Sequence, residues 1–165
     1  MKPQLDFDGP GPTRLVSVDP ADAPLQPEVT ALERELARRG YTTVLNHYRQ
    51  ALDGLANHKF ESANGDLRTT LEDLVTRIAL DHTGYELKTG QDGRPRANQG
   101  GFAIDHMVNK TGSLPKEDGG EMLHGLWSMT CTNGSHPGTS DADEARCRMQ
   151  LVTATARLLL NHFPA

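Results

Sequence analysis

The segment 127–138 carries the densest set of side chains that could do chemistry. Its reactive polar residues are Thr130, Cys131, Thr132, Asn133, Ser135 and His136. A tight polar corner just before a long helix brings a histidine close to free backbone N–H groups, where an anion also binds. Because imidazole titrates near neutral pH, His136 is a candidate general acid or base. The same residues are also typical of plain turns, since Asn-Gly tolerates positive φ and Pro-Gly sets a bend.

A second candidate lies on a predicted helix, where Arg68 and Glu72 stand four residues apart among leucines. As an exposed ion pair at this spacing they would contribute only about 0.3 kcal/mol. Turned inward, the Arg68 guanidinium would instead hold His136 or a phosphate in its planar fork. The phosphate-binding residues predicted with it are Asn64, Glu72, Asn133 and Ser135.

Metal and cofactor chemistry finds little support in the sequence. A zinc site could be assembled from His124, Cys131, His136 and Cys147, but their spacing matches no compact zinc pattern. Cys147 also falls on an apolar helical stripe, where a small hydrophobic residue is sufficient. Neither cysteine has an activating neighbour in the sequence, and no glycine-rich phosphate loop of a standard form is present. We therefore predict no metal and no cofactor.

Two parts of the chain must position these residues. Residues 1–27 hold six of the ten prolines, which fix φ and remove backbone donors. The sequence predicts an extended Pro-rich arm over 1–27, with one short edge strand at 15–18, and a single domain over 28–165. The arm would either lie on this domain or reach a partner.

The domain shows apolar residues at helical spacing. Helices are predicted over 27–39, 41–55, 61–82, 101–111, 119–131 and 140–163, with an exposed loop over 84–101. The last helix has Ser140 as its predicted N-cap and carries two apolar stripes. The second stripe is Cys147, Leu151, Ala154 and Leu158. So wide an apolar face suits a central bundle helix, or one that also meets a second subunit. The predicted fold is an all-α helical bundle.

Length, composition and net charge limit the classes of function that the protein can have. A length of 165 residues fits one domain, and 36% hydrophobic residues are enough to form a core. No apolar run approaches the ~20 residues that cross a bilayer, and no signal-peptide pattern opens the chain. With only two cysteines we expect a reduced, cytoplasmic protein. The net charge of −5 disfavours non-specific binding of duplex nucleic acid.

Two segments resemble a known family. The string ESANGDLRTTLE at 61–72 resembles the arginine and leucine-glutamate helix of abortive-infection C-terminal-like domains, and GSHPG at 134–138 resembles their glycine-histidine corner. Both occur in the expected order within 41–163. Those domains are similar to the wider HEPN class of helical bundles, many of which dimerise and cut RNA without metal in phage-defence and toxin systems. The resemblance implies an HEPN-like bundle.

One departure from that class concerns catalysis. Catalytic HEPN domains carry an arginine, four to six residues and then a histidine at the start of a late helix. The corresponding positions before His136 hold Cys131, Thr130 and Met129. Arginine-x4-histidine strings occur at 77–82 and 157–162, but both end predicted helices, where histidine faces the negative end of the dipole. The resemblance therefore supports the fold more than the catalysis.

Three functions are compatible with these observations. We rank first a non-catalytic dimerising or regulatory module of a prokaryotic phage-defence or toxin–antitoxin system, in which His136 and Arg68 form a structural pair. The alternative is a metal-independent endoribonuclease, with His136 as general acid or base and Arg68 stabilising the phosphorane. The third is a small-molecule or nucleotide sensor that uses the same corner.

The expected partners differ between these functions. We expect a homodimer that does not bind a membrane and that contacts either a protein partner of the defence system or RNA. The charge around the corner separates the two partners. A basic groove formed by Arg68, Arg146 and Arg148 would favour RNA, whereas an acidic or apolar surface would favour a protein.

Overall fold

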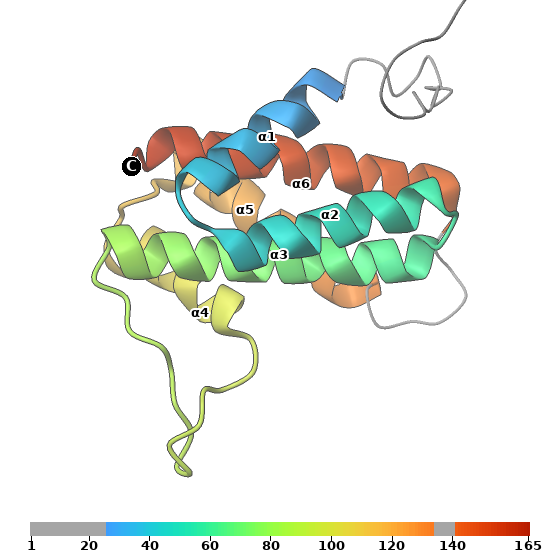
Figure 1. Cartoon of the computed structure of the whole chain (residues 1–165). Coiled ribbons are helices and arrows are strands. Elements are labelled where there is room, and N and C mark those ends of the chain that lie inside the picture. The colour runs from blue at the N-terminus through green and yellow to red at the C-terminus, as the bar shows by residue number, and fades with distance from the viewer. Residues whose placement is uncertain (1–25, 134–140) are drawn as a thin grey trace, which may run out of the picture.

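The computed structural model describes residues 26–133 and 141–165, which are almost entirely helical (Figure 1). The helices are α1 Gln26–Arg38, α2 Thr42–Ala56, α3 Phe60–His82, α4 Gln99–Asp105, α5 Glu121–Asn133 and α6 Ala142–His162. Two π-helical turns, η1 His106–Lys110 and η2 Lys116–Gly120, follow α4 and precede α5. No strand occurs in the described residues, so the all-α prediction is confirmed there. The strand predicted at 15–18 lies outside them, and residues 26–27 of the predicted arm already belong to α1.

Helices α2 and α3 form an antiparallel pair joined by residues 57–59 (Figure 1). Their backbones approach closely at Gly54, where an added Cβ would lie 3.1 Å from the Cβ of Ala63. The Lys59 amide also donates to the Gly54 carbonyl at 2.8 Å, which closes the turn between them. This pair is the scaffold on which the other helices pack.

Helix α6 runs in the same direction as α3. The ring of His82, at the end of α3, lies 5.7 Å from the ring of Phe163, which directly follows α6. Arg39 donates to the carbonyls of Leu160 and Phe163, while its neighbour Tyr41 donates to Asp81 of α3. The carboxyl ends of both helices therefore meet at one end of the bundle, as Figure 1 shows.

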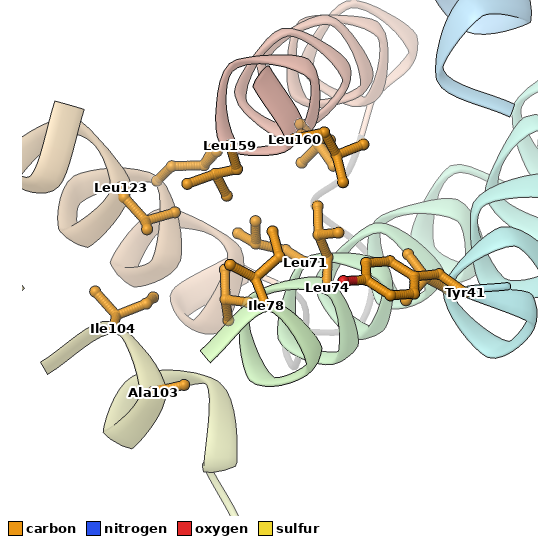
Figure 2. Close-up of a cluster of buried hydrophobic side chains, with 14 of the residues drawn as sticks. Tyr41, Leu71, Leu74, Ile78, Ala103, Ile104, Leu123, Leu159 and Leu160 are labelled. Carbon is orange, nitrogen blue, oxygen red and sulfur yellow. The ribbon is translucent and has the colours of Figure 1, made fainter. Parts of the chain in front are cut away.

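The core contains residues of all six α-helices of the described residues, and Figure 2 shows the part of it between α3, α4, α5 and α6. Leu71, Leu74 and Ile78 of α3 are fully buried, as their helical spacing predicts. They point toward Leu159 and Leu160 of α6 (Figure 2). Burial of each such side chain contributes about 1.5–3 kcal/mol to folding, so this cluster fixes the relative positions of α3 and α6.

Local departures from the predicted helices have physical causes. The helix predicted over 101–111 is α4 continued by the π-helical turn η1. The N-cap of α6 is Asp141, not Ser140, because the Asp141 carboxylate accepts the Glu144 amide at 2.8 Å. An ionised carboxylate at this position also opposes the positive end of the helix dipole, which favours aspartate as the cap.

A long excursion over 83–98 leaves the bundle between α3 and α4 (Figure 1). Gln99 holds its base with four hydrogen bonds, to the Tyr85 hydroxyl, the Lys88 amide, the Lys88 carbonyl and the Arg96 carbonyl. Of the loop predicted over 84–101, residues 99–101 belong to α4 and Gly100 is buried. Residues 84–98 are exposed as predicted, apart from the buried Tyr85 and the partly buried Gly90. No helix in the described part of the chain is long and apolar enough to cross a bilayer.

Candidate functional site

The predicted polar corner lies largely outside the described residues. Ser135 and His136 fall in the gap between α5 and α6, and Asn133 is the last residue of α5. Their roles as catalytic and phosphate-binding residues therefore stay predictions. The other predicted site residues, Asn64, Arg68 and Glu72, occupy successive turns of α3.

On α3, the expected ion pair between Arg68 and Glu72 is not formed. The Glu72 carboxylate instead accepts the Gly100 amide at 3.4 Å, at the start of α4. The Arg68 Nε is buried and has no hydrogen-bond partner, whereas Arg68 as a whole residue is only partly buried. Arg68 is thus turned inward, as the functional interpretation required, but without the carboxylate that the spacing predicted.

Close packing at Gly100 explains why Glu72 turns toward α4. A Cβ at Gly100 would lie 2.8 Å from the Trp127 ring and 3.1 Å from the Glu72 Cα. Only glycine allows α4 to contact α3 and α5 at this distance. Trp127 is 8% exposed, so its side chain is part of the core.

Arg148 is one of the three arginines whose exposure as a basic groove would favour RNA as the partner. Its side chain is 2% exposed and is the largest fully buried one in the described residues. Its Nη2 donates to the Glu144 carboxylate at 2.6 Å, while Nε and Nη1 have no partner. The four-residue spacing to Glu144 and the adjacent core residue Met149 were the available signals.

Arg146, the third arginine of the expected groove, is partly exposed and lies 3.7 Å from the Asp143 carboxylate. Because Arg148 is buried and Arg146 is paired, these two residues do not form an open basic surface. The condition that would favour RNA, an open basic groove around these arginines, is therefore not met at Arg146 and Arg148.

The outer face of α6 is apolar and exposed. The second stripe, Cys147, Leu151, Ala154 and Leu158, lies on the surface. Leu151 and Leu158 are 42% and 41% exposed. The first stripe, which includes Ala145, Met149 and Val152, is buried. The two stripes thus have separate roles, one inside the bundle and the other facing solvent.

A histidine–aspartate pair lies between α2 and α3. His47 Nε2 lies 3.6 Å from Asp73 Oδ2. Burial raises the pKa of Asp73, and the charge of His47 opposes this rise. Asp73 and Arg77 both line a hollow of about 280 Å³ beside the start of α2. Because these walls carry opposite charges, the hollow offers no net charge to an ion.

The described residues contain no group of three or more His, Cys, Asp or Glu side chains placed to hold a metal ion. Of the zinc ligands considered from the sequence, Cys131 is partly buried and Cys147 is exposed. His136 lies outside the described residues.

Comparison with known proteins identifies no relative: no family model, curated protein or solved structure matches the chain. The resemblance to abortive-infection C-terminal-like domains therefore stays an expectation from the sequence. The site is argued below from its own residues.

Proposed function

We propose that this protein is a dimerising module that pairs through the outer stripe of α6. The observation that carries this proposal is the exposure of Leu151 and Leu158 along one helix face. Exposed leucines at helical spacing are typical of a surface that another helix covers. Single-residue exposure is ordinary on a protein surface, but two leucines on one line with Ala154 and Cys147 form a continuous apolar strip.

A second copy of the same chain fits the strip well. In an antiparallel pair related by a two-fold axis midway between residues 152 and 153, Leu151 faces Ala154 of the other copy. In the same register Cys147 faces Leu158. Each large side chain thus meets a small one, which allows close packing of the two helices. No other combination of the four stripe residues pairs all of them in this way.

The helix dipoles also favour this orientation. An antiparallel arrangement places the positive end of each α6 dipole beside the negative end of its partner. This contribution is small beside the apolar contact, but it selects the antiparallel orientation over the parallel one.

The context proposed for this module is prokaryotic phage defence or a toxin–antitoxin system, which the sequence resemblance suggests. Regulation would follow from assembly and would not need catalysis. The endoribonuclease alternative depends on His136, and its basic groove is not supported by the positions of Arg146 and Arg148. We therefore do not advance it as a second function.

The first test is the oligomeric state in solution, measured by sedimentation equilibrium. We expect a dimer for the unaltered protein and a monomer for Leu151→Glu/Leu158→Glu, because four carboxylates cannot be buried in one apolar contact. Leu87→Glu is the matched control, since Leu87 is equally exposed at 43% but lies in the 83–98 excursion. An unaltered protein that is monomeric at all concentrations would refute the proposal.

Oxidative crosslinking tests the register. In a Cys131→Ser background, the antiparallel pair predicts no disulfide dimer through Cys147, because Cys147 faces Leu158. Adding Leu158→Cys should produce a disulfide dimer, since a facing pair satisfies the Cβ–Cβ distance of about 3.5–4.5 Å. A parallel pair would instead crosslink through Cys147 without the added cysteine.

A further inference from the structure

Arg148 presents a buried charge that the protein only partly satisfies. Its side chain is 2% exposed, yet two of its three guanidinium nitrogens, Nε and Nη1, have no hydrogen-bond partner. Removing a charge from water costs several kcal/mol unless hydrogen bonds replace its hydration. Nearly all buried polar groups are therefore bonded, and each exception calls for a physical explanation, such as a bound ion.

Counting back along α3 and α6 from their carboxyl ends brings Arg68 close to the level of Arg148. Because α3 and α6 run in the same direction and have the same rise per residue, positions equally far from their contacting ends are side by side. His82 and Phe163 mark that contact. Fifteen residues back from these two are Leu67 and Arg148, so Arg68 is one residue from the level of Arg148.

Both arginines lie on faces that turn toward α5. Arg68 shares its face with Glu72, which bonds to Gly100, and Gly100 in turn abuts Trp127 of α5. Arg148 shares its face with Leu159, three turns later, and Leu159 points toward Leu123 of α5 (Figure 2). The last turns of α5 therefore lie between the two arginines.

Among the described residues, the charges at this junction do not balance. Arg68 and Arg148 bring two positive charges, and Glu144 supplies one carboxylate in contact with Arg148. Glu72, the α3 carboxylate at the four-residue spacing from Arg68, bonds to the Gly100 amide instead. Three buried nitrogens remain without acceptors, namely Nε of Arg68 and both Nε and Nη1 of Arg148.

We propose that Arg148 and Arg68 bind a small phosphate-bearing anion at the junction of α3, α5 and α6. A phosphate group offers several acceptor oxygens to guanidinium groups and cancels the excess charge. The partly exposed Arg68 marks the side of entry, and Arg148 the inner wall. The burial of Arg148 favours a small ligand over a nucleic-acid backbone, which could not reach it. This site is separate from the exposed stripe of α6 and does not depend on dimerisation.

Thermal unfolding in inorganic phosphate tests the proposal, with sodium chloride at equal ionic strength as the reference. We expect a saturable rise in the melting temperature, because a ligand that binds only the folded state stabilises it. Arg68→Gln should lose this rise. The matched control is Arg77→Gln, nine residues along the same helix, where the arginine is exposed and paired with Asp81. This control should respond as the unaltered protein does.

Arg148→Met probes the inner wall, because methionine keeps an unbranched side chain without the charge. The folded variant should show no phosphate response, and if it does not fold, Arg68→Gln decides alone. Identical melting in phosphate and chloride, or an undiminished response of Arg68→Gln, would overturn the proposal. A nucleoside monophosphate tested in parallel distinguishes the source of the phosphate group. A larger rise than with inorganic phosphate assigns a phosphate ester, and an equal or smaller rise assigns free phosphate.

Discussion

The side chains of Arg39 and Arg148 are both almost completely buried, and they differ in how their nitrogens are used. The Arg39 side chain is 3% exposed and donates from Nε to Glu35, from Nη1 to the Phe163 carbonyl and from Nη2 to the Leu160 carbonyl. Arg148 is equally buried but donates only from Nη2. Burial alone therefore does not show whether a charge serves the fold.

The partners of Arg39 explain what it does. The carbonyls of Leu160 and Phe163 lie at the end of α6, where the last helical carbonyls have no intrahelical donor. A guanidinium there satisfies them and opposes the negative end of the helix dipole. Arg39 thus fastens the α1–α2 corner to the end of α6. Among the described residues, the one hydrogen bond of Arg148 goes to Glu144, which belongs to the same helix.

The largest effect should come from removing Arg39. We expect Arg39→Met to lower the free energy of unfolding by about 3 kcal/mol, since three charge-assisted hydrogen bonds are lost and buried carbonyls lose their donor. Urea denaturation measures this change. Arg49→Met serves as the control, because Arg49 is 58% exposed and should leave the unfolding midpoint nearly unchanged.

The buried and uncharged pair of Tyr48 and Thr153 provides a reference for the stability effects expected at Arg39 and Arg148. The Tyr48 hydroxyl lies 2.7 Å from the Thr153 hydroxyl, and burial raises the pKa of Tyr48 to about 12. Tyr48→Phe should cost about 1.5 kcal/mol, the usual value for one buried hydrogen bond and the partner left behind. Tyr48→Phe/Thr153→Val should recover part of the loss, because valine removes the hydroxyl that has lost its tyrosine partner. The Thr153 hydroxyl also lies 3.6 Å from the Met149 sulfur. A double variant that is less stable than the single one would contradict this interpretation.

Removing Arg148 should change stability less. Without added phosphate, we expect Arg148→Met to alter the free energy of unfolding by less than about 1 kcal/mol, because the desolvation cost of the charge is removed together with its single bond. Urea denaturation in a phosphate-free buffer provides the measurement. A loss as large as that of Arg39→Met would show that the two arginines are equivalent in the fold, and the contrast between them would disappear.

The smallest effect on stability is expected at Glu35, whose carboxylate accepts a hydrogen bond from Arg39. Hydrogen bonds from Arg38 and Arg39 lower the pKa of Glu35 from 4.5 to about 2. Because the folded pKa is depressed, the ionised Glu35 stabilises the protein above its unfolded pKa, and this contribution disappears as the pH falls through the folded pKa. Unaltered protein should exceed Glu35→Gln in stability by a few tenths of a kcal/mol near pH 6. Urea denaturation should show this difference shrinking as the pH falls from about 4.5 to about 2, and a difference that does not depend on pH would contradict the assignment.

The helices were largely predictable because local periodicity encodes them. The spacing of Leu67, Leu71, Leu74 and Ile78 predicted a helix over 61–82, and α3 spans Phe60–His82. The stripe of α6 that faces the core of the bundle was likewise recognisable from its spacing. In such elements the same residues decide the local conformation and the buried face, so one pattern contains both.

The site was less predictable because it depends on contacts between distant segments. Four-residue spacing predicted a pair between Arg68 and Glu72, but the close approach at Gly100 draws Glu72 away. No local pattern shows that Gly100 meets Trp127. The same spacing between Glu144 and Arg148 did produce a pair, yet the sequence did not reveal that this pair is buried. Side-chain spacing limits which partners are possible, and tertiary packing selects among them.

The hydrogen bonds of Gln99 have a consequence for local opening of the 83–98 excursion. One side chain joins Tyr85, Lys88 and Arg96 at the base of the 83–98 excursion. Beyond this point the excursion is closed only by hydrogen bonds around the bridge between residues 89 and 95. It therefore has its own opening equilibrium, separate from global unfolding, and its amide hydrogens should exchange with solvent well before those of α3. We therefore expect that this segment can be labelled, extended by a tag or cleaved by a protease while the helical bundle stays folded.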